Sequence, residues 1–161
     1  MKRAILPGLT LLLALLPALP AAAQPAAPKS LSVKLDGAVK MPATFTLAQL
    51  QAMPSVSIDV TYQGQAKSSW KGVSLLALIQ GAGTIDEAGN NAVLRHAILA
   101  KGSDGYVVAI AIAEIEPDFA GKQAVVAYER DGKPLDGLRL VMPGDAHAGR
   151  NVRDLAEITL N

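Results

Sequence analysis

A mostly β member of the α+β class is predicted by three features of the sequence. Short runs of alternating or β-branched apolar residues recur along the chain, and such runs are typical of strands in an antiparallel or mixed sheet. Asp-Gly pairs follow or separate several of these runs, as they do at tight turns. Helix start signals are few and lead into short apolar stretches, so two or three short helices are expected.

The first part of the domain is predicted to hold a strand followed by a short helix. Residues 31–35, LSVKL, alternate between polar and apolar side chains. Thr46 and Gln49 have the spacing of a capping box, in which each side chain accepts from the other residue's backbone N–H. A helix is therefore expected over residues 47–53, ended by Pro54.

A second strand and a second helix are expected on either side of a polar segment. Residues 56–62 place Val, Ile, Val and Tyr at alternate positions, as a half-buried strand does. The stretch GQAKSSWKGV, residues 64–73, is polar and is expected to be irregular. Ser74 can cap a short helix over residues 75–80, which Gly81 would end.

Five strand-like runs complete the domain after a loop at residues 81–91. In chain order they are AVLRHAILA (92–100), YVVAIAIA (106–113), QAVVAYE (123–129), LRLVM (138–142) and LAEITL (155–160). Alternation and β-branched residues in these runs favour strands over helices.

The first 23 residues have the pattern of a secretory signal peptide. Lys2 and Arg3 give a positive start, residues 5–19 are apolar, and Ala21 to Ala23 supply a small-x-small cleavage site. The apolar run is short for a membrane span, which needs about 20 residues, and no later stretch resembles one. Export to the periplasm is therefore expected.

Removal of this leader leaves a flexible tether, residues 24–30, and one domain, residues 31–161. The whole chain has 15 basic and 14 acidic residues; without Lys2 and Arg3 these become 13 and 14, a net charge of −1. A chain without excess positive charge is not expected to bind nucleic acid or an anionic membrane surface.

The chain contains no cysteine, which excludes disulfides, a thiolate nucleophile and every metal site built on thiolates. His96 and His147 are its only histidines, so a histidine-rich metal centre is excluded as well. No metal is expected.

The loop VMPGDAHAGRNVRDL, residues 141–155, gathers polar side chains at the end of a predicted strand. Arg150 and Arg153 offer planar donors for carboxylate, phosphate or carbonyl groups, and Asp145 can accept from an amino-pyrimidine edge. His147 can donate or accept near neutral pH. The alternative is that Asp145 and the arginines pair with each other and fix the last turn.

Two further places could contact a flat ligand. Trp70, the only tryptophan, follows Ser69 in a polar stretch and could stack on a ring with hydroxyls nearby, or could instead fill the core. Asp104 could accept from ligand N–H groups, with Tyr106 as a stacking ring. The alternative is that Asp104-Gly105 forms a hairpin turn and nothing more.

Other polar groups do not suggest an enzyme. Glu114, Glu116 and Asp118 surround Pro117 and are interpreted as a surface turn. No glycine-rich nucleotide loop and no Ser-His-Asp arrangement can be identified.

The order of several motifs resembles a known family. They are FTLAQLQAMPSVSIDVTY, SSWKGVSLLALIQGAG, GSDGYVVAIAIAEI, VVAYERDGKPL and LRLVMPGD followed by GRNVRDLAEITL. Together they are similar to the sulfite-oxidase-type molybdopterin-binding domain in a short, exported form. The resemblance implies a mixed, mostly β α+β fold in which loops on one side of the sheets enclose a pterin.

The same resemblance argues against catalysis. Enzymes of the family hold molybdenum through a cysteine thiolate between the VSIDVTY-like strand and the W-x-G-V motif. Here that segment is TYQGQAKSSWKGV, without cysteine. Molybdenum held in this way needs the soft sulfur ligand. Oxidoreductase activity is therefore not expected.

Short relatives without the cysteine are similar to periplasmic pterin-binding regulators, which bind a reduced pterin and act on the periplasmic domain of a membrane receptor. The leading hypothesis is such a non-catalytic pterin sensor. One alternative is an accessory protein or redox-complex subunit that carries a molybdopterin-type cofactor, in which Arg150 and Arg153 would bind its phosphate. Another is an interaction domain whose pocket has lapsed. The candidate ligand-binding residues are Ser69, Trp70, Asp104, Tyr106, Asp145, His147, Arg150 and Arg153.

Overall fold

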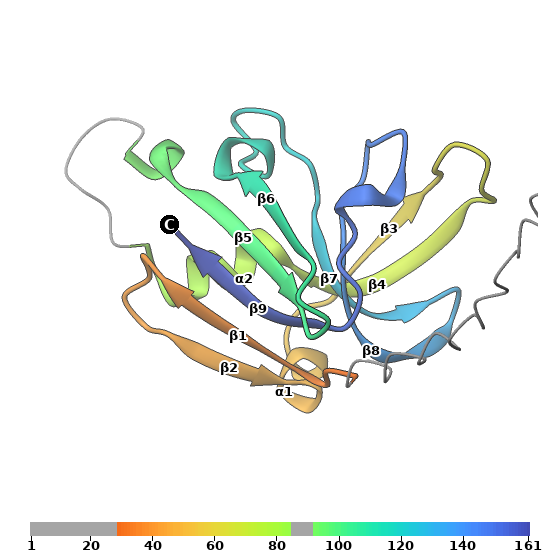
Figure 1. Cartoon of the computed structure of the whole chain (residues 1–161), viewed down its shortest axis with the longest axis horizontal. Helices are drawn as coiled ribbons and strands as arrows, with labels where there is room; N and C mark the ends of the chain where they lie inside the picture. The colour runs from red at the N-terminus through yellow and green to blue at the C-terminus, as the bar shows by residue number, and fades with distance from the viewer. Residues whose placement is uncertain (1–28, 85–91) are drawn as a thin grey trace, which may run out of the picture.

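Residues 29–84 and 92–161 are the part of the chain that the computed structural model describes, and they form two β-sheets and two short α-helices (Figure 1). The expected signal peptide, most of the expected tether and residues 85–91 lie outside these residues. The last tether residue, Ser30, accepts a hydrogen bond from the backbone N–H of Leu138 at 2.8 Å. No helix in the described ranges has the length and apolarity needed to cross a bilayer.

The first sheet has five strands and is mixed, within the antiparallel or mixed arrangement expected. Its order is β2 (Ala43–Thr46), β1 (Ser32–Gly37), β9 (Leu155–Leu160), β5 (Ala97–Gly102) and β6 (Val107–Ala111). β1 and β9 are parallel, and all other neighbours are antiparallel. The C-terminal strand thus lies between the N-terminal strand and the β5–β6 hairpin, which closes the domain.

The second sheet has four strands, all antiparallel. Its order is β3 (Val56–Val60), β4 (Ser68–Ser74), β7 (Val125–Arg130) and β8 (Lys133–Val141). The pairing of β4 with β7 shifts between Lys71 and Gly72. A Cβ atom at Gly72 would lie 2.1 Å from the carbonyl oxygen of Val126. Only glycine allows the two backbones to approach this closely.

The helices begin where the capping signals predicted. α1 (Leu47–Ala52) starts at the Thr46 capping box, in which the Thr46 N–H donates to Gln49 Oε1 at 2.8 Å. α2 (Leu75–Ala82) starts at Ser74, whose hydroxyl accepts from the Ala77 N–H at 3.3 Å. It ends at Gly83, two residues later than expected, because Gly83 adopts a φ of 66° that stops the helix.

Two clusters of buried apolar residues pack against the sheets. The larger joins both sheets and α2, and its fully buried residues include Leu35, Leu78, Val126 and Ile158. The smaller comprises Ile58, Val60, Tyr62, Trp70, Val125, Ala127 and Val141. Val125 and Val126 are successive residues of β7 and therefore face opposite sides of the sheet. The smaller cluster, with Trp70, thus covers the face of the second sheet that is turned away from the larger core.

Several local predictions differ from the structure. The segment expected to be irregular contains β4, because its backbone pairs on both sides, with β3 and with β7. The start of the run 92–100 is a 3₁₀ turn, η1 (Ala92–Arg95), and the strand begins only at Ala97. The four-residue strand β2 was missed. Two more 3₁₀ turns, η2 (Ile112–Glu114) and η3 (Ala148–Arg150), lie in the second half.

Candidate functional site

A polar pocket of about 130 Å³ lies beside the smaller cluster. We call it the arginine pocket; it is lined by Tyr62, Gln65, Ser68, Trp70, Arg130, Arg139, Ala148, Asn151 and Arg153. β4, β7 and β8 supply its base, and the loops after β3 and before β9 supply its walls. No carboxylate is among the residues that line it.

Strand pairing brings the three arginines together from distant parts of the chain. Arg130 at the end of β7 is the register partner of Trp70 on β4. Leu140 and Val152 form an isolated antiparallel bridge, with N–H···O distances of 3.0 and 3.1 Å. Arg139 and Arg153 precede and follow these bridge residues, so they stand opposite each other on the same side of the pair.

The Trp70 side chain is only 2% exposed and contacts two of the cations. The guanidinium carbons of Arg130 and Arg139 lie 4.9 and 5.3 Å from its ring centroid. Cation–π attraction of this kind stabilises positive charge held close to an indole. The buried indole therefore leaves little surface for stacking on a ligand, and instead holds two guanidinium groups beside the pocket.

The arginine pocket carries more positive charge than its neighbours neutralise. Arg130 pairs with Asp131 at 3.3 Å, near the solvent. Within the described ranges, neither Arg139 nor Arg153 forms a salt bridge. The pKa of Arg139 is lowered by burial and by the nearby charges of Arg153 and Arg130, and the carboxylate of Asp154 offsets only part of this. Because these guanidinium groups are all hydrogen-bond donors and repel one another, the pocket favours a ligand with an anionic group, such as a phosphate or carboxylate.

A tyrosine and an asparagine fix one wall. The Tyr62 hydroxyl lies 2.9 Å from the carbonyl oxygen of Met142 and 2.9 Å from Asn151 Oδ1, and its one hydrogen can be donated to either. Asn151 Oδ1 also accepts from the Met142 N–H at 2.9 Å. Burial raises the pKa of Tyr62, so the hydroxyl stays protonated and available as a donor. The loop before β9 is thereby fastened to the end of β8.

The Ser68 hydroxyl is expected to contribute more to the stability of the fold than the Ser69 hydroxyl does. Its hydroxyl accepts from Trp70 Nε1 at 2.9 Å, and both side chains are buried. Ser68→Ala should lower the free energy of unfolding by about 1–2 kcal/mol, because the indole N–H loses its buried acceptor. The matched control, Ser69→Ala, removes an exposed hydroxyl and should change it by less than about 0.5 kcal/mol. Denaturant unfolding of both variants checks this; equal effects would contradict it.

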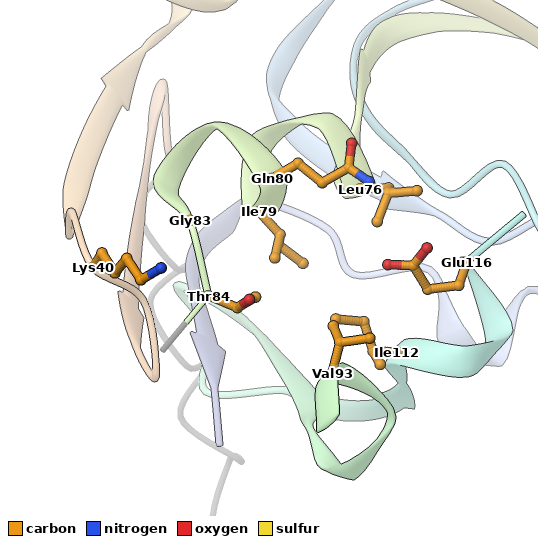
Figure 2. Close-up of a pocket in the computed structure, with 9 residues that line it drawn as sticks. All are labelled: Lys40, Leu76, Ile79, Gln80, Gly83, Thr84, Val93, Ile112 and Glu116. Carbon is orange, nitrogen blue, oxygen red and sulfur yellow. The ribbon is translucent and has the colours of Figure 1, made fainter. Parts of the chain in front are cut away.

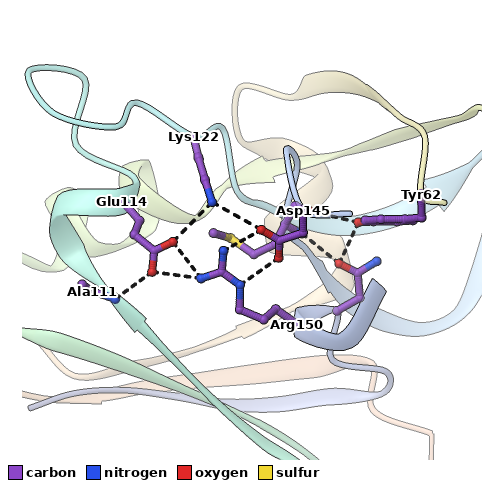
Figure 3. Close-up of polar contacts among 8 residues, drawn as sticks. Tyr62, Ala111, Glu114, Lys122, Asp145 and Arg150 are labelled. Carbon is purple, nitrogen blue, oxygen red and sulfur yellow. Dashed lines mark hydrogen bonds and ion pairs between the residues drawn. The ribbon is translucent and has the colours of Figure 1, made fainter. Parts of the chain in front are cut away.

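In addition to the contacts of Tyr62, an ion-pair network fixes the loop after β8 (Figure 3). It consists of Glu114, Lys122, Asp145 and Arg150. Arg150 binds Asp145 with two parallel bonds, from Nε at 2.8 Å and from Nη2 at 2.7 Å. Its Nη1 donates to both oxygens of Glu114, at 2.9 and 2.7 Å. The Lys122 ammonium lies 3.4 Å from Glu114 and 3.3 Å from Asp145.

This network corrects the interpretation of Glu114 as part of a surface turn. Its side chain is only 28% exposed, and it reaches Arg150 across a gap of 36 residues in the sequence. Glu116, in contrast, turns away from the network and lines a different pocket. The two glutamates therefore do not act as one acidic cluster.

The network should make stability depend on pH. Hydrogen bonds from Arg150 lower the pKa of Asp145. The pKa of Glu114 is raised by burial but more strongly lowered by Arg150 and Lys122, so its net shift is also downward. Carboxylates with depressed pKa values stabilise the fold above their ordinary values, 3.8 and 4.5, and lose this contribution as the pH falls through the depressed values.

Asp145→Asn should therefore destabilise the protein by about 1–2 kcal/mol at pH 7, and the difference from wild type should shrink below about pH 4. Denaturant unfolding between pH 7 and pH 3 measures it. Asp118→Asn, which removes an exposed carboxylate from the same half of the chain, is the control. A difference that stays constant over this range would show that the charge of Asp145 is not what stabilises the loop.

Of the eight candidate residues, Trp70 and Arg153 line the arginine pocket. Asp145 and Arg150 lie next to it but bond each other, which was the stated alternative for this loop. His147 is exposed at the start of η3. Ligand binding by these residues stays a prediction.

The remaining three candidates form hydrogen bonds within the protein. Asp104 accepts from the N–H of Tyr106 at 2.9 Å and so closes the β5–β6 hairpin turn, as its alternative interpretation had it. The Tyr106 hydroxyl donates to the Gly149 carbonyl at 2.5 Å. Ser69 is exposed, and its backbone N–H donates to Asp131 at 2.7 Å.

Sequence reasoning missed Arg130, Arg139, Tyr62 and Asn151. One usable signal was Arg139, a charged residue within the apolar run LRLVM. In a strand with one face on a core, such a residue must lie on the other face, near whatever covers it. The others carried no local signal, because register alone brings them to the pocket.

Comparison with known proteins agrees with this architecture. The family model described as "Oxidoreductase molybdopterin binding domain" matches residues 20–161. Among solved structures, the chain is similar to the sulfane dehydrogenase SoxCD from Paracoccus pantotrophus, with a TM-score of 0.65 and 17% identity. The match covers 80% of this chain but only 37% of that one, and at this identity it shows the fold alone. A search of curated proteins gave no match.

Proposed function

Because this chain belongs to the oxidoreductase molybdopterin-binding domain family, we propose that it binds a pterin with an anionic side-chain group, such as a phosphate, without molybdenum and without redox catalysis. One observation carries the proposal. Three guanidinium groups, from Arg130, Arg139 and Arg153, line one pocket in which no carboxylate takes part. Charge-assisted donors in a half-buried site favour phosphate-like groups over neutral ones.

The size of the pocket supports a ligand that is only partly enclosed. Sites that enclose a whole small molecule measure roughly 300–1,000 Å³. The arginine pocket, at about 130 Å³, is large enough for one anionic group of such a molecule. The rest of the ligand would extend over the loops that contain Gln65 and Ala148, which form the walls.

A phosphorylated ligand fits the site better than a neutral pterin. A neutral pterin would need an open aromatic face and free carboxylates for its amino edge. Trp70 is buried against Arg130 and Arg139, and Asp145 is engaged by Arg150 and Lys122. An anionic side chain would instead relieve the repulsion among the arginines, which is a gain that a neutral ligand cannot provide.

The residues present do not fit molybdenum as the family's enzymes hold it. The chain has no cysteine, and the soft ligand those enzymes use has no replacement in the loop between β3 and β4. The residues there and in the pocket offer hydroxyl, amide, indole and guanidinium groups, of which guanidinium and indole are donors only. In the described ranges no group of three or more His, Asp or Glu side chains could hold a metal ion.

In this proposal the protein works in the periplasm and passes ligand occupancy to a partner, such as the periplasmic domain of a membrane receptor. The support is the position of the loop with η3. It carries Ala148 and Asn151 of the pocket wall on one side, and presents exposed residues, among them His147 and Gly149, on the other. A ligand that contacts the wall would change the surface that a partner meets.

The test is calorimetric titration of the purified domain with a reduced pterin that bears a phosphate ester, and with the same pterin after removal of the phosphate. The proposal expects micromolar or tighter binding of the first and at least about 30-fold weaker binding of the second, a difference of about 2 kcal/mol. Molybdate, titrated into the protein with the phosphorylated pterin bound, should give no stoichiometric uptake of metal. Equal affinities for the two pterins would contradict the proposal.

A further inference from the structure

A second pocket, of about 320 Å³, shares no residue with the arginine pocket (Figure 2). It lies between α2 and the 3₁₀ turns η1 and η2. Its apolar lining is supplied by Leu76, Ile79, Val93 and Ile112. Leu76 and Val93 are half-buried and provide the accessible apolar surface, whereas Ile79 and Ile112, 1% and 0% exposed, lie beneath it. The volume is within the range of sites that enclose a small molecule, roughly 300–1,000 Å³.

Two opposite charges stand at the rim. Figure 2 shows Lys40 and Glu116 on opposite sides of the pocket, each with its charged end directed toward the space between them. Among residues 29–84 and 92–161, neither side chain has an ion pair or a hydrogen bond to its charged group. They do not pair with each other across the pocket, so no side chain in the described ranges neutralises either charge.

Backbone hydrogen bonds hold both rim positions. The Lys40 N–H donates to the carbonyl of Gly83 at 2.7 Å, which ties the lysine to the C-terminal end of α2. The Glu116 N–H donates to the carbonyl of Ile112 at 3.0 Å, and the Glu116 carbonyl accepts from Gly121 at 3.0 Å. A site whose charged groups sit on fixed backbone needs less ordering when a ligand binds.

The geometry points to a binding site for a small amphipathic zwitterion: an apolar body over Leu76 and Val93, an anionic group at Lys40 and an amine at Glu116. The apolar floor favours a hydrocarbon body, because contact removes apolar surface from water. The two rim charges fix its direction, since reversal would place like charges together. This ligand differs in chemical class from the pterin, and the site is independent of the arginine pocket.

The test uses three probes of one chain length: 6-aminohexanoate, hexanoate and hexylamine. Methyl NMR spectra of the whole domain, labelled at leucine and valine, report contact at Leu76 and Val93. The zwitterion is expected to shift the methyl signals of both residues and to bind at least about tenfold more tightly than either single-charge probe. Its shorter and longer homologues, 4-aminobutyrate and 8-aminooctanoate, then give the spacing that the rim prefers.

Two variants and two controls decide the roles of the rim charges. Glu116→Gln should reduce the affinity of 6-aminohexanoate to that of hexanoate, and Lys40→Met should reduce it to that of hexylamine. Asp118→Asn and Lys133→Met remove exposed charges of the same signs outside the pocket and should leave the affinity unchanged. The inference is overturned if no probe moves the Leu76 and Val93 methyl signals at tens of millimolar, if hexanoate binds as tightly as the zwitterion, or if both rim variants bind like wild type.

Discussion

Arg139→Met is expected to weaken binding of the phosphorylated pterin about 100-fold without destabilising the fold. A charge-assisted hydrogen bond to an anionic group contributes about 2–3 kcal/mol, which corresponds to a factor of roughly 100 in affinity. Stability should not fall, because burial and the charges of Arg153 and Arg130 already disfavour the charged form of Arg139, as its lowered pKa indicates. Methionine keeps an apolar side chain near Trp70 and removes the repulsion.

The measurement pairs calorimetric titration with denaturant unfolding of the same variant. Arg95→Met, which removes an exposed arginine outside the pocket, controls for the change in net charge and should bind like wild type. Arg150→Met gives a contrast, because it breaks the network with Asp145 and Glu114 and should lower stability by about 1–3 kcal/mol. If Arg139→Met unfolded more easily than wild type yet bound the ligand normally, Arg139 would be a structural residue.

Gly72→Ala is expected to destabilise the fold strongly. The new Cβ atom would lie 2.1 Å from the Val126 carbonyl oxygen and 2.6 Å from Ala127 Cα, both of which are backbone atoms that cannot rotate away. β4 and β7 would have to separate at the centre of the second sheet. A loss of at least about 3 kcal/mol follows, which lowers the melting temperature by roughly 10 °C for a domain of this size.

Gly81→Ala is the matched control for this prediction. Gly81 lies within α2, and a Cβ atom there meets no atom within 4 Å. Alanine favours helix more than glycine does, so this variant should be more stable than wild type by up to about 1 kcal/mol. Thermal unfolding of both variants measures the effects. Similar melting temperatures for the two would mean that the β4–β7 backbones are not held as closely as the structure has them.

The parts of the fold that sequence predicted well are those with local causes. The capping box at Thr46 and the cap at Ser74 fix where helices begin, and the alternation in LAEITL gives β9 with its observed bounds. β4 was not predicted because its cause is not local. Three serines, a lysine and a glycine are unusual in a central strand, and the backbone pairing is supplied by β3 and β7.

In the candidate site, too, residues with a local signal were predicted and residues brought in by strand pairing were not. Trp70 and Arg153 were identified from residue type, but the pocket depends on Arg130 and Arg139, which the pairing of β7 with β4 and β8 brings there. The side chains of Asp145 and Arg150 have the chemistry of a ligand site. Their bonding to each other was the alternative stated for this loop. The bond from Arg150 to Glu114 could not be read from spacing, because the two residues are 36 positions apart.

The central claim is that the anionic group of the ligand binds in the arginine pocket rather than at the ion-pair network of the neighbouring loop. The most direct measurement is ¹⁵N NMR of the arginine Nε–H groups and the Trp70 Nε1–H group during titration with the phosphorylated pterin. The account predicts that the Arg139, Arg153 and Trp70 signals shift together with one dissociation constant, while Arg150 stays unchanged in its bonds to Asp145 and Glu114. A shift of Arg150 with no change at Arg139 and Arg153 would contradict it.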